Sequence, residues 1–387
     1  MEENITTAEA VEVVPSAAVS EETIPQKKQR KPINQQKLMD NIWGWVFCIP
    51  LIVGTVWFVY IAFVLALMLS FTDFSMSKGL WDVIGNYASE VDKFASSVDH
   101  AGHGGAFFWY AQAFTKTIDG SLTNLNEMGA YLLNTVVYLI GIPIGMVLSM
   151  FFAVCMSRDI KGGNLFRVIY YLPCVASTVA IVYTFKIMFD STGVINQLLG
   201  LAGDEAGQGA FIWMATTGNA ALTWGTMTGS NSTSAFMIDP YWCQGLFTKL
   251  VIIIMAVWKG LGGTIILYAA GLAGVNAATK EAAQIDGANG WQIFWKVTMP
   301  DLYPVIFYNI VTAVIGGMQI YMEPVLLVGE DYMTSGYVSL IWNYGINGNG
   351  NAMAARPSQG AALGMLLAIL IFVITMFQFW LDSRNKD

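Results

Sequence analysis

Long stretches without charged residues constrain this chain more than any other feature. Four of them reach or approach the roughly 20 residues that a helix needs to cross a bilayer. Two further stretches, 250–275 and 302–328, are apolar on both sides of one internal charge, Lys259 and Glu323 respectively. We therefore predict an all-α integral membrane protein with six transmembrane helices. The four uncharged stretches are 41–72, 128–157, 168–185 and 357–381.

Composition supports a membrane protein independently. Hydrophobic residues make up 55% of the 387 residues and charged residues 12%, whereas soluble domains carry roughly 25% charged residues. The formal net charge of −8 comes partly from acidic loops and partly from an acidic N-terminal tail, so it says nothing about nucleic acid. We expect no nucleic-acid partner. Residues 211–227 are apolar too, but threonines and an asparagine interrupt this short segment, and we place it outside the membrane.

Lysine and arginine are distributed unevenly between the two sides of the predicted spans. Cytoplasmic segments of membrane proteins are enriched in these cations. Here they gather in the N-terminal tail, in the connections after the second and fourth spans, and at the C-terminus. We therefore expect a multi-pass protein with both termini in the cytoplasm. Twelve of the nineteen cations lie in these segments: Lys27, Lys28, Arg30, Lys31, Lys37, Arg158, Lys161, Arg167, Lys280, Lys296, Arg384 and Lys386.

The segments around the predicted spans divide the chain further. Residues 1–40 have no apolar segment after a basic start, so we expect a disordered cytoplasmic tail and no cleavable signal ahead of a first transmembrane helix at 41–72. The extracytoplasmic loop 73–127 is too aromatic for a random linker and is predicted to fold as a cap. A core with five spans follows at 128–382, interrupted by an insertion at about 203–231.

Cysteine and histidine show no spacing typical of a disulfide framework or a metal site. Three cysteines lie in predicted spans and a fourth near the outer surface, while both histidines lie in a glycine-rich loop without a second pair of ligands. We expect no metal. The residues are Cys48, Cys155, Cys174, Cys243, His100 and His103.

A polar loop between two apolar stretches carries the most specific pattern. Residues 277–285 are mostly good helix formers, Gly287 and Gly290 permit backbone angles that end a helix, and 291–297 can form a second short helix. Pro300 suits the first turn of the next membrane helix. The pattern predicts a helix-turn-helix knob at 277–299 whose small residues fit a groove of another protein, although any loop between spans must also turn. These small residues are Ala282, Ala283, Gly287 and Ala288.

The same loop closely resembles the cytoplasmic loop of the permease subunits of binding-protein-dependent ABC transporters, the part that touches the ATPase. The resemblance rests on Glu281, Ala282, Ala283, Asp286, Gly287, Ala288, Phe294 and Pro300. Further motifs stand in the order seen in the carbohydrate, maltose-type branch over roughly 134–381. They are Asn134-Thr135, Phe166-Arg167, Tyr171-Leu172-Pro173, Gly193-Val194-Ile195-Asn196, Asp239-Pro240 and Trp258. The chain departs from the family in its two outer insertions and in Gly329-Glu330-Asp331.

This resemblance implies the fold and the partners. It implies a type I ABC importer permease with extended extracytoplasmic loops, located in a bacterial plasma membrane and importing a sugar or oligosaccharide. The implied partners are a second permease subunit in a heterodimer, two cytoplasmic ATPase subunits and an extracytoplasmic solute-binding protein. The chain has no GxxxxGK[ST] motif, so we expect ATP and Mg²⁺ to bind the partners and this chain to hold no cofactor and to be no enzyme.

Three alternative functions differ from a sugar permease in what they require of the sequence. An intramembrane enzyme would use Lys259 and Glu323 in catalysis, but nucleophile and base motifs are missing from the sequence. A passive channel would leave the 277–299 loop without a role. A permease for a non-sugar solute remains the other alternative.

Polar groups inside spans are costly in lipid and commonly face a cavity or a partner. The resemblance implies that substrate-facing positions cluster after the Leu-Pro of the third span, around Trp258, and midway along the fifth span. Gln319 is expected one turn before Glu323 on the same helix face. Lys259 and Glu323 form either a structural pair or part of the substrate path. The implied path residues are Cys174, Thr178, Lys259, Gly260, Gly263, Gly316, Gln319 and Tyr321, and Glu323 joins them by its charge.

Overall fold

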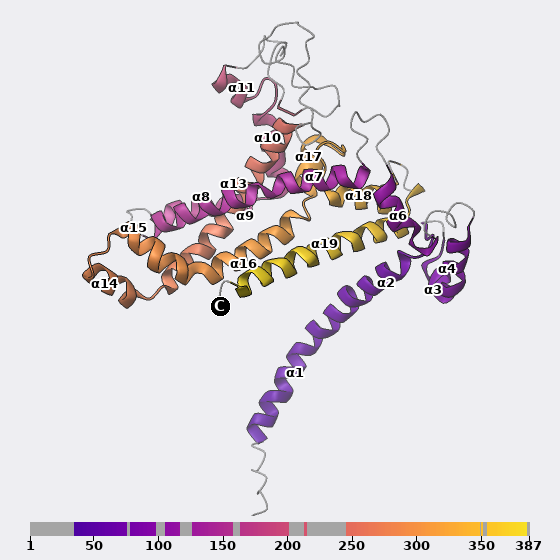
Figure 1. The fold of residues 1–387 in the computed structure, drawn as a ribbon, viewed down its shortest axis with the longest axis horizontal. Helices are drawn as coiled ribbons and strands as arrows, with labels where there is room; N and C mark the ends of the chain where they lie inside the picture. The colour runs from indigo at the N-terminus through magenta and orange to yellow at the C-terminus, as the bar shows by residue number, and fades with distance from the viewer. Residues whose placement is uncertain are drawn as a thin grey trace, which may run out of the picture. The chain divides into compact units, whose positions relative to one another are not determined.

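A computed structural model shows how these stretches fold. It describes residues 35–75, 78–97, 105–116, 126–157, 163–200, 213–214, 245–348, 350 and 354–384. Within these ranges the regular structure is helical, without a β-strand (Figure 1). The chain divides into two units, 1–60 and 61–387.

The first unit contains one helix. α1 (Gln35–Thr55) passes into a π-helical turn, η1 (Val56–Tyr60). Large apolar side chains such as Phe47 and Phe58 are about three-quarters exposed, at 77% and 76%, as expected for a helix that faces lipid. α1 begins six residues before the end of the predicted 1–40 tail, which is therefore too long, and the rest of that tail lies outside the described residues.

The second unit holds the other membrane helices. Among the described residues, five helices are long and apolar enough to cross a membrane, and the first of them is Trp43–Leu69. The number is six when the bent pair α9 and α10 counts as one span. This agrees with the predicted number. The bounds are α2 (Ile61–Leu69), α7 (Glu127–Leu139), α8 (Gly141–Met156), α9 (Gly163–Val175), α10 (Thr178–Met188), α13 (Leu246–Gly274), α16 (Met299–Gly317) and α19 (Pro357–Arg384).

The third span differs from the single helix expected at 168–185. α9 and α10 meet at an angle of 97°. Ser177 between them has an extended backbone, with φ −59° and ψ 132°, so the helix cannot continue through it. Because the sequence is uniformly apolar on both sides of the break, hydrophobicity alone does not predict it.

The fifth span also differs from its prediction at 302–328. The helix runs from Gly290 to Gly317, and residues after it form a separate short helix, α17 (Met322–Val328). Gly316 and Gly317 are poor helix formers, and Tyr321 leaves helical geometry with φ −141°. Because the segment stays apolar across the break, its hydrophobicity alone predicts one continuous span.

The predicted 73–127 loop contains helices that pack around aromatic rings. The ring of Phe94 stacks on that of Trp109 with centroids 5.7 Å apart, and both side chains are buried with Ala362 of α19. The elements are α3 (Leu80–Gly85), α4 (Tyr87–Ser96), the 3₁₀ turn η2 (Gly105–Phe107) and α6 (Phe108–Thr115).

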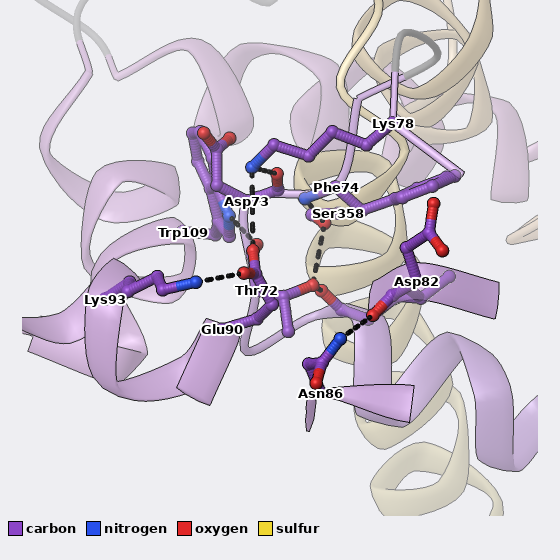
Figure 2. Close-up of polar contacts among 11 residues, drawn as sticks. Thr72, Asp73, Phe74, Lys78, Asp82, Asn86, Glu90, Lys93, Trp109 and Ser358 are labelled. Carbon is purple, nitrogen blue, oxygen red and sulfur yellow. Dashed lines mark hydrogen bonds and ion pairs between the residues drawn. The ribbon is translucent and has the colours of Figure 1, made fainter. Parts of the chain in front are cut away.

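Hydrogen bonds tie this cap to the membrane helices, as Figure 2 shows. The Trp109 indole N–H donates to the Thr72 carbonyl at 2.9 Å, and the Phe74 amide donates to the Ser358 hydroxyl at 2.8 Å. Ser358 is fully buried at the second residue of α19. These bonds satisfy polar groups that burial would otherwise penalise.

α13 is the central helix of the second unit and packs against α8, α9, α10 and α16. A glycine allows its closest approach to α9, since a Cβ on Gly262 would lie 2.4 Å from the carbonyl oxygen of Tyr170. Three further short elements belong to the unit. They are α11 (Val194–Leu199), α18 (Tyr337–Trp342) and the π-helical turn η5 (Asn343–Asn347).

Candidate functional site

An ion pair lies between the membrane helices of the second unit. Lys259 Nζ of α13 is 2.8 Å from Glu323 Oε1 of α17 and donates a second hydrogen bond, also 2.8 Å long, to Thr178 Oγ1 of α10. The side chains of Lys259 and Glu323 are only 28% and 17% exposed. Three predicted path residues from distant parts of the sequence therefore form one polar cluster.

The two unpredicted breaks in the helices create this cluster. Thr178 is the first residue of α10, directly after the bend at Ser177. Glu323 lies in the first turn of α17, after the break that follows Gly317. The carboxylate and the ammonium satisfy each other in a region of apolar side chains, where an unpaired charge would be costly.

The other predicted path residues take no part in the hydrogen bonds of this cluster. Gly260 and Gly263 of α13 are exposed, and a Cβ on Gly263 would contact Cys174 Sγ at 3.6 Å. Gly316 is exposed as well, with no atom within 4 Å of the position of a Cβ. The Tyr321 ring packs against Trp342, with centroids 5.9 Å apart. An exposed face of the helices therefore borders the ion pair.

Gln319 is placed differently from its prediction. It lies in the turn between α16 and α17, so it does not share a helix face with Glu323. Its side chain is exposed and makes no hydrogen bond to the described residues, while its backbone amide donates to the Gly316 carbonyl at 3.1 Å.

The polar loop after α13 folds as a compact turn between two helices. α14 (Ala277–Ile285) has the predicted bounds, and Asn276 caps it by accepting a hydrogen bond from the Ala278 amide at 2.9 Å. Gly287 follows with φ +79°. The Gly287 amide donates to the Gln284 carbonyl and the Ala288 amide to the Ala283 carbonyl, each at 3.0 Å, which is the Schellman pattern that favours glycine at this position.

The second half of the loop differs in part from the prediction. α15 (Gly290–Ile293) passes through a π-helical turn, η4 (Phe294–Thr298), directly into α16, so the second short helix is the start of the fifth span. Asn289 and Gln292 form a capping box that begins α15. Gly290 stands at the first helical position rather than in a turn, and Pro300 lies in the first turn of α16 as predicted.

Exposed apolar side chains on this knob were not singled out from the sequence. Ile285 is 86% exposed and Trp291 71% exposed. The sequence signal that could have identified them is the presence of large apolar residues in a polar loop outside the spans. The predicted contact residues Glu281, Ala282, Asp286 and Gly287 are exposed around them, with Ala283 and Ala288 partly buried. In Figure 1 the knob lies at the opposite end of the second unit's long helices from α6 and α18.

Several predicted features lie outside the described residues. The described part of the chain contains no cluster of three or more His, Cys, Asp or Glu side chains that could hold a metal. The segments not described include His100, His103, Cys243, Asp239-Pro240 and nearly all of 203–231.

The second unit combines membrane helices with one bent pair, α9 and α10, and a fifth span that ends before α17, and comparison with known proteins assigns the family. Residues 141–387 match the family described as the binding-protein-dependent transport system inner membrane component. The chain belongs to this family. The matched region includes the ion pair, the exposed face beside it and the knob, whereas the cap precedes it.

Individual relatives extend the similarity. The probable ABC transporter permease protein YesP of Bacillus subtilis is 26% identical over 90% of this chain and 94% of its own length. The lactose transport system permease LacF of Rhizobium radiobacter is 31% identical over 65% of this chain and 75% of its own length. The arabinooligosaccharides permease AraP of Halalkalibacterium halodurans is 30% identical over 68% of this chain and 72% of its own length.

A solved structure shares the fold. A chain of a bacterial ABC transporter that imports the acidic polysaccharide alginate superposes with a TM-score of 0.57 at 18% identity, covering 91% of this chain and 99% of that chain. The all-α importer-permease fold implied by the sequence is therefore confirmed.

Proposed function

We propose that this chain forms one half of the translocation path of an ABC importer for a sugar or oligosaccharide in a bacterial plasma membrane. The observation that carries the proposal is the similarity of the family-matched region to permeases named for lactose, arabinooligosaccharides and multiple sugars. Membership in a transport family argues against an intramembrane enzyme built on Lys259 and Glu323.

The knob made by α14 and α15 is the proposed coupling element. A partner that covers exposed apolar side chains such as Ile285 and Trp291 lowers the free energy of the complex, because their surface leaves water. The small residues beside them let a groove approach closely. We assign the partner as one of two cytoplasmic ATPase subunits, which bind the ATP and Mg²⁺ that this chain is not expected to bind.

The face that borders the ion pair is the proposed substrate path. Gly260, Gly263 and Gln319 are exposed on one chain, so a second permease subunit is needed to enclose the solute. Hydroxyl groups of a sugar suit the hydrogen-bonding capacity of Thr178, Lys259 and Glu323 beside them.

We propose that transport in this arrangement proceeds by alternating access. Thr178, Lys259 and Glu323 belong to α10, α13 and α17, so a movement of these helices against one another changes the hydrogen bonds among the three side chains. We propose that closure of the ATPase dimer moves the knob, and that the helices then open the path toward an extracytoplasmic solute-binding protein.

The proposal is tested on the assembled complex. The chain is purified with the subunits that bind it, and ATP hydrolysis is measured while its cognate binding protein is added with and without each sugar of a panel. We expect stimulation by the binding protein together with one class of sugar. A complex without an ATPase subunit, or stimulation only by a non-sugar solute, would refute the proposal.

A further inference from the structure

A polar pocket lies at the cap end of the second unit, away from the ion pair and the knob. Its volume is about 210 Å³. The polar and charged side chains that line it come from α6 and its C-cap, from η5, from the residue directly before α19, and from the first turn of α19. They are Gln112, Lys116, Tyr344, Arg356 and Gln359.

The two cations in this pocket have different surroundings. Lys116 Nζ is 3.3 Å from Glu127 Oε2, and the Tyr344 hydroxyl donates to the same carboxylate oxygen at 2.7 Å. The Arg356 guanidinium lies over the Trp109 ring, 5.4 Å from its centroid. Among the described residues no carboxylate lies within ion-pair distance of Arg356, so within this part of the chain no carboxylate balances its positive charge.

The remaining polar groups are held in place. Gln359 is only 8% exposed, and its side-chain nitrogen Nε2 donates to the side-chain oxygen Oε1 of Gln112 at 3.2 Å. The Arg356 backbone amide donates to the Tyr344 carbonyl at 2.8 Å. Guanidinium and ammonium groups are donors only, so a ligand that complements this pocket supplies acceptor oxygens and negative charge.

The volume of the pocket further restricts the class of ligand. The pocket is smaller than the roughly 300 Å³ at which sites for drug-sized ligands begin, so it fits one ring rather than a chain. Amide side chains next to an arginine suit a ring that carries hydroxyl groups together with a carboxylate.

We propose that this pocket is an outer subsite for a uronic acid residue of an acidic oligosaccharide, with Arg356 bound to its carboxylate. The inference rests on the proposed sugar import and adds the substrate class. Two of the lining side chains, Gln112 and Lys116, belong to the cap segment, which precedes the family-matched region. The subsite thus gives the cap a function, at the end of the helices opposite the knob.

Direct binding to the assembled complex tests this subsite. We expect a galacturonic acid trimer to bind, measured by calorimetry on the complex in nanodiscs without its binding protein, and a neutral galactose trimer to bind at least about tenfold more weakly. Arg356→Gln should lower the affinity for the acidic trimer about tenfold or more, because a charge-assisted hydrogen bond is lost. Arg356→Lys should keep part of the affinity.

The controls separate the subsite from general charge effects. Arg384→Gln removes a cation that also lies over a tryptophan, Trp380, at 5.1 Å, and should leave binding unchanged. Three results would overturn the subsite: equal affinities for the acidic and the neutral trimer, an affinity for acetate equal to that for the acidic trimer, or an affinity for the acidic trimer that does not change in Arg356→Gln. Failure of ATPase stimulation by any sugar would instead overturn the proposed import function, so the two results are distinguishable.

Discussion

At the residue scale, the ion pair between Lys259 and Glu323 governs the behaviour of the candidate path. Each charge is partly shielded from solvent and satisfied mainly by the other. Thr178 adds a neutral acceptor that holds the ammonium in position. Removing one member therefore leaves a charge in an apolar region, whereas removing both leaves none.

The first expectation is a double-mutant result. Lys259→Met or Glu323→Leu alone should lower the stability of the purified complex by about 1 to 3 kcal/mol, less than for a fully buried pair because both side chains keep some solvent contact. The double variant should recover part of that loss. The midpoint of thermal unfolding measures both effects, and strictly additive losses would show that the two charges do not depend on each other.

The second expectation concerns Gln319. Its amide is exposed and free of hydrogen bonds to the described residues, so it is available to a sugar, and a lost contact of this kind lowers affinity roughly tenfold to a hundredfold. Gln319→Leu should therefore reduce sugar uptake in membrane vesicles while expression and basal ATP hydrolysis stay near normal. Unchanged uptake with saturating binding protein would remove Gln319 from the path.

At the element scale, glycines decide how the helices pack and turn. Gly262 brings α13 against α9 at a distance that leaves no room for a side chain, while Gly260, two residues earlier on the same helix, has open space around it. Gly287 has a positive φ in the turn of the knob, while Gly290 has an ordinary helical position. Each pair offers a matched comparison.

The third expectation uses the first pair. In Gly262→Ala the new Cβ meets the backbone of Tyr170, so α9 and α13 must separate, which typically costs about 1 to 3 kcal/mol. Gly260→Ala should leave stability equal or slightly higher, because alanine favours helix. Chemical unfolding of the purified complex compares the two variants, and equal midpoints would contradict the close packing.

The fourth expectation uses the second pair. Gly287→Val forces a β-branched residue into a positive φ and should distort the turn between α14 and α15, weakening copurification of the ATPase. Gly290→Val should not, since its backbone is helical and its surroundings are open. If both variants retain the ATPase and normal uptake, the knob is not the coupling element.

The sequence was informative about elements where local signals agree. α14 and its Gly287 turn follow from helix propensity and a glycine at the C-terminal end, and the apolar runs of the six predicted spans follow from composition. The bend at Ser177 and the break after Gly317 were missed because hydrophobicity continues across them. From the sequence, a structural pair between Lys259 and Glu323 was one of two alternatives, because the breaks that bring α10 and α17 to α13 were not predicted.

At the scale of the whole molecule, the distribution of cations predicts that both termini and the knob are cytoplasmic and that the cap is outside. A further expectation is that Ser97→Cys, in a background without the four native cysteines, reacts with an impermeant thiol reagent in intact cells. Position 97 is the C-cap residue directly after α4 of the cap. Labelling only after permeabilisation would reverse the assigned orientation.

ATP-driven uptake in proteoliposomes tests the central claim most directly. The assembled complex is reconstituted with a labelled sugar of the class that stimulates its ATPase, and uptake is compared with and without ATP and the cognate binding protein. We expect uptake that requires both and that falls in Gly287→Val but not in Gly290→Val. Uptake that continues without ATP, or no uptake by an assembled complex whose ATPase responds to the sugar, would contradict the account of this chain as a coupled sugar permease.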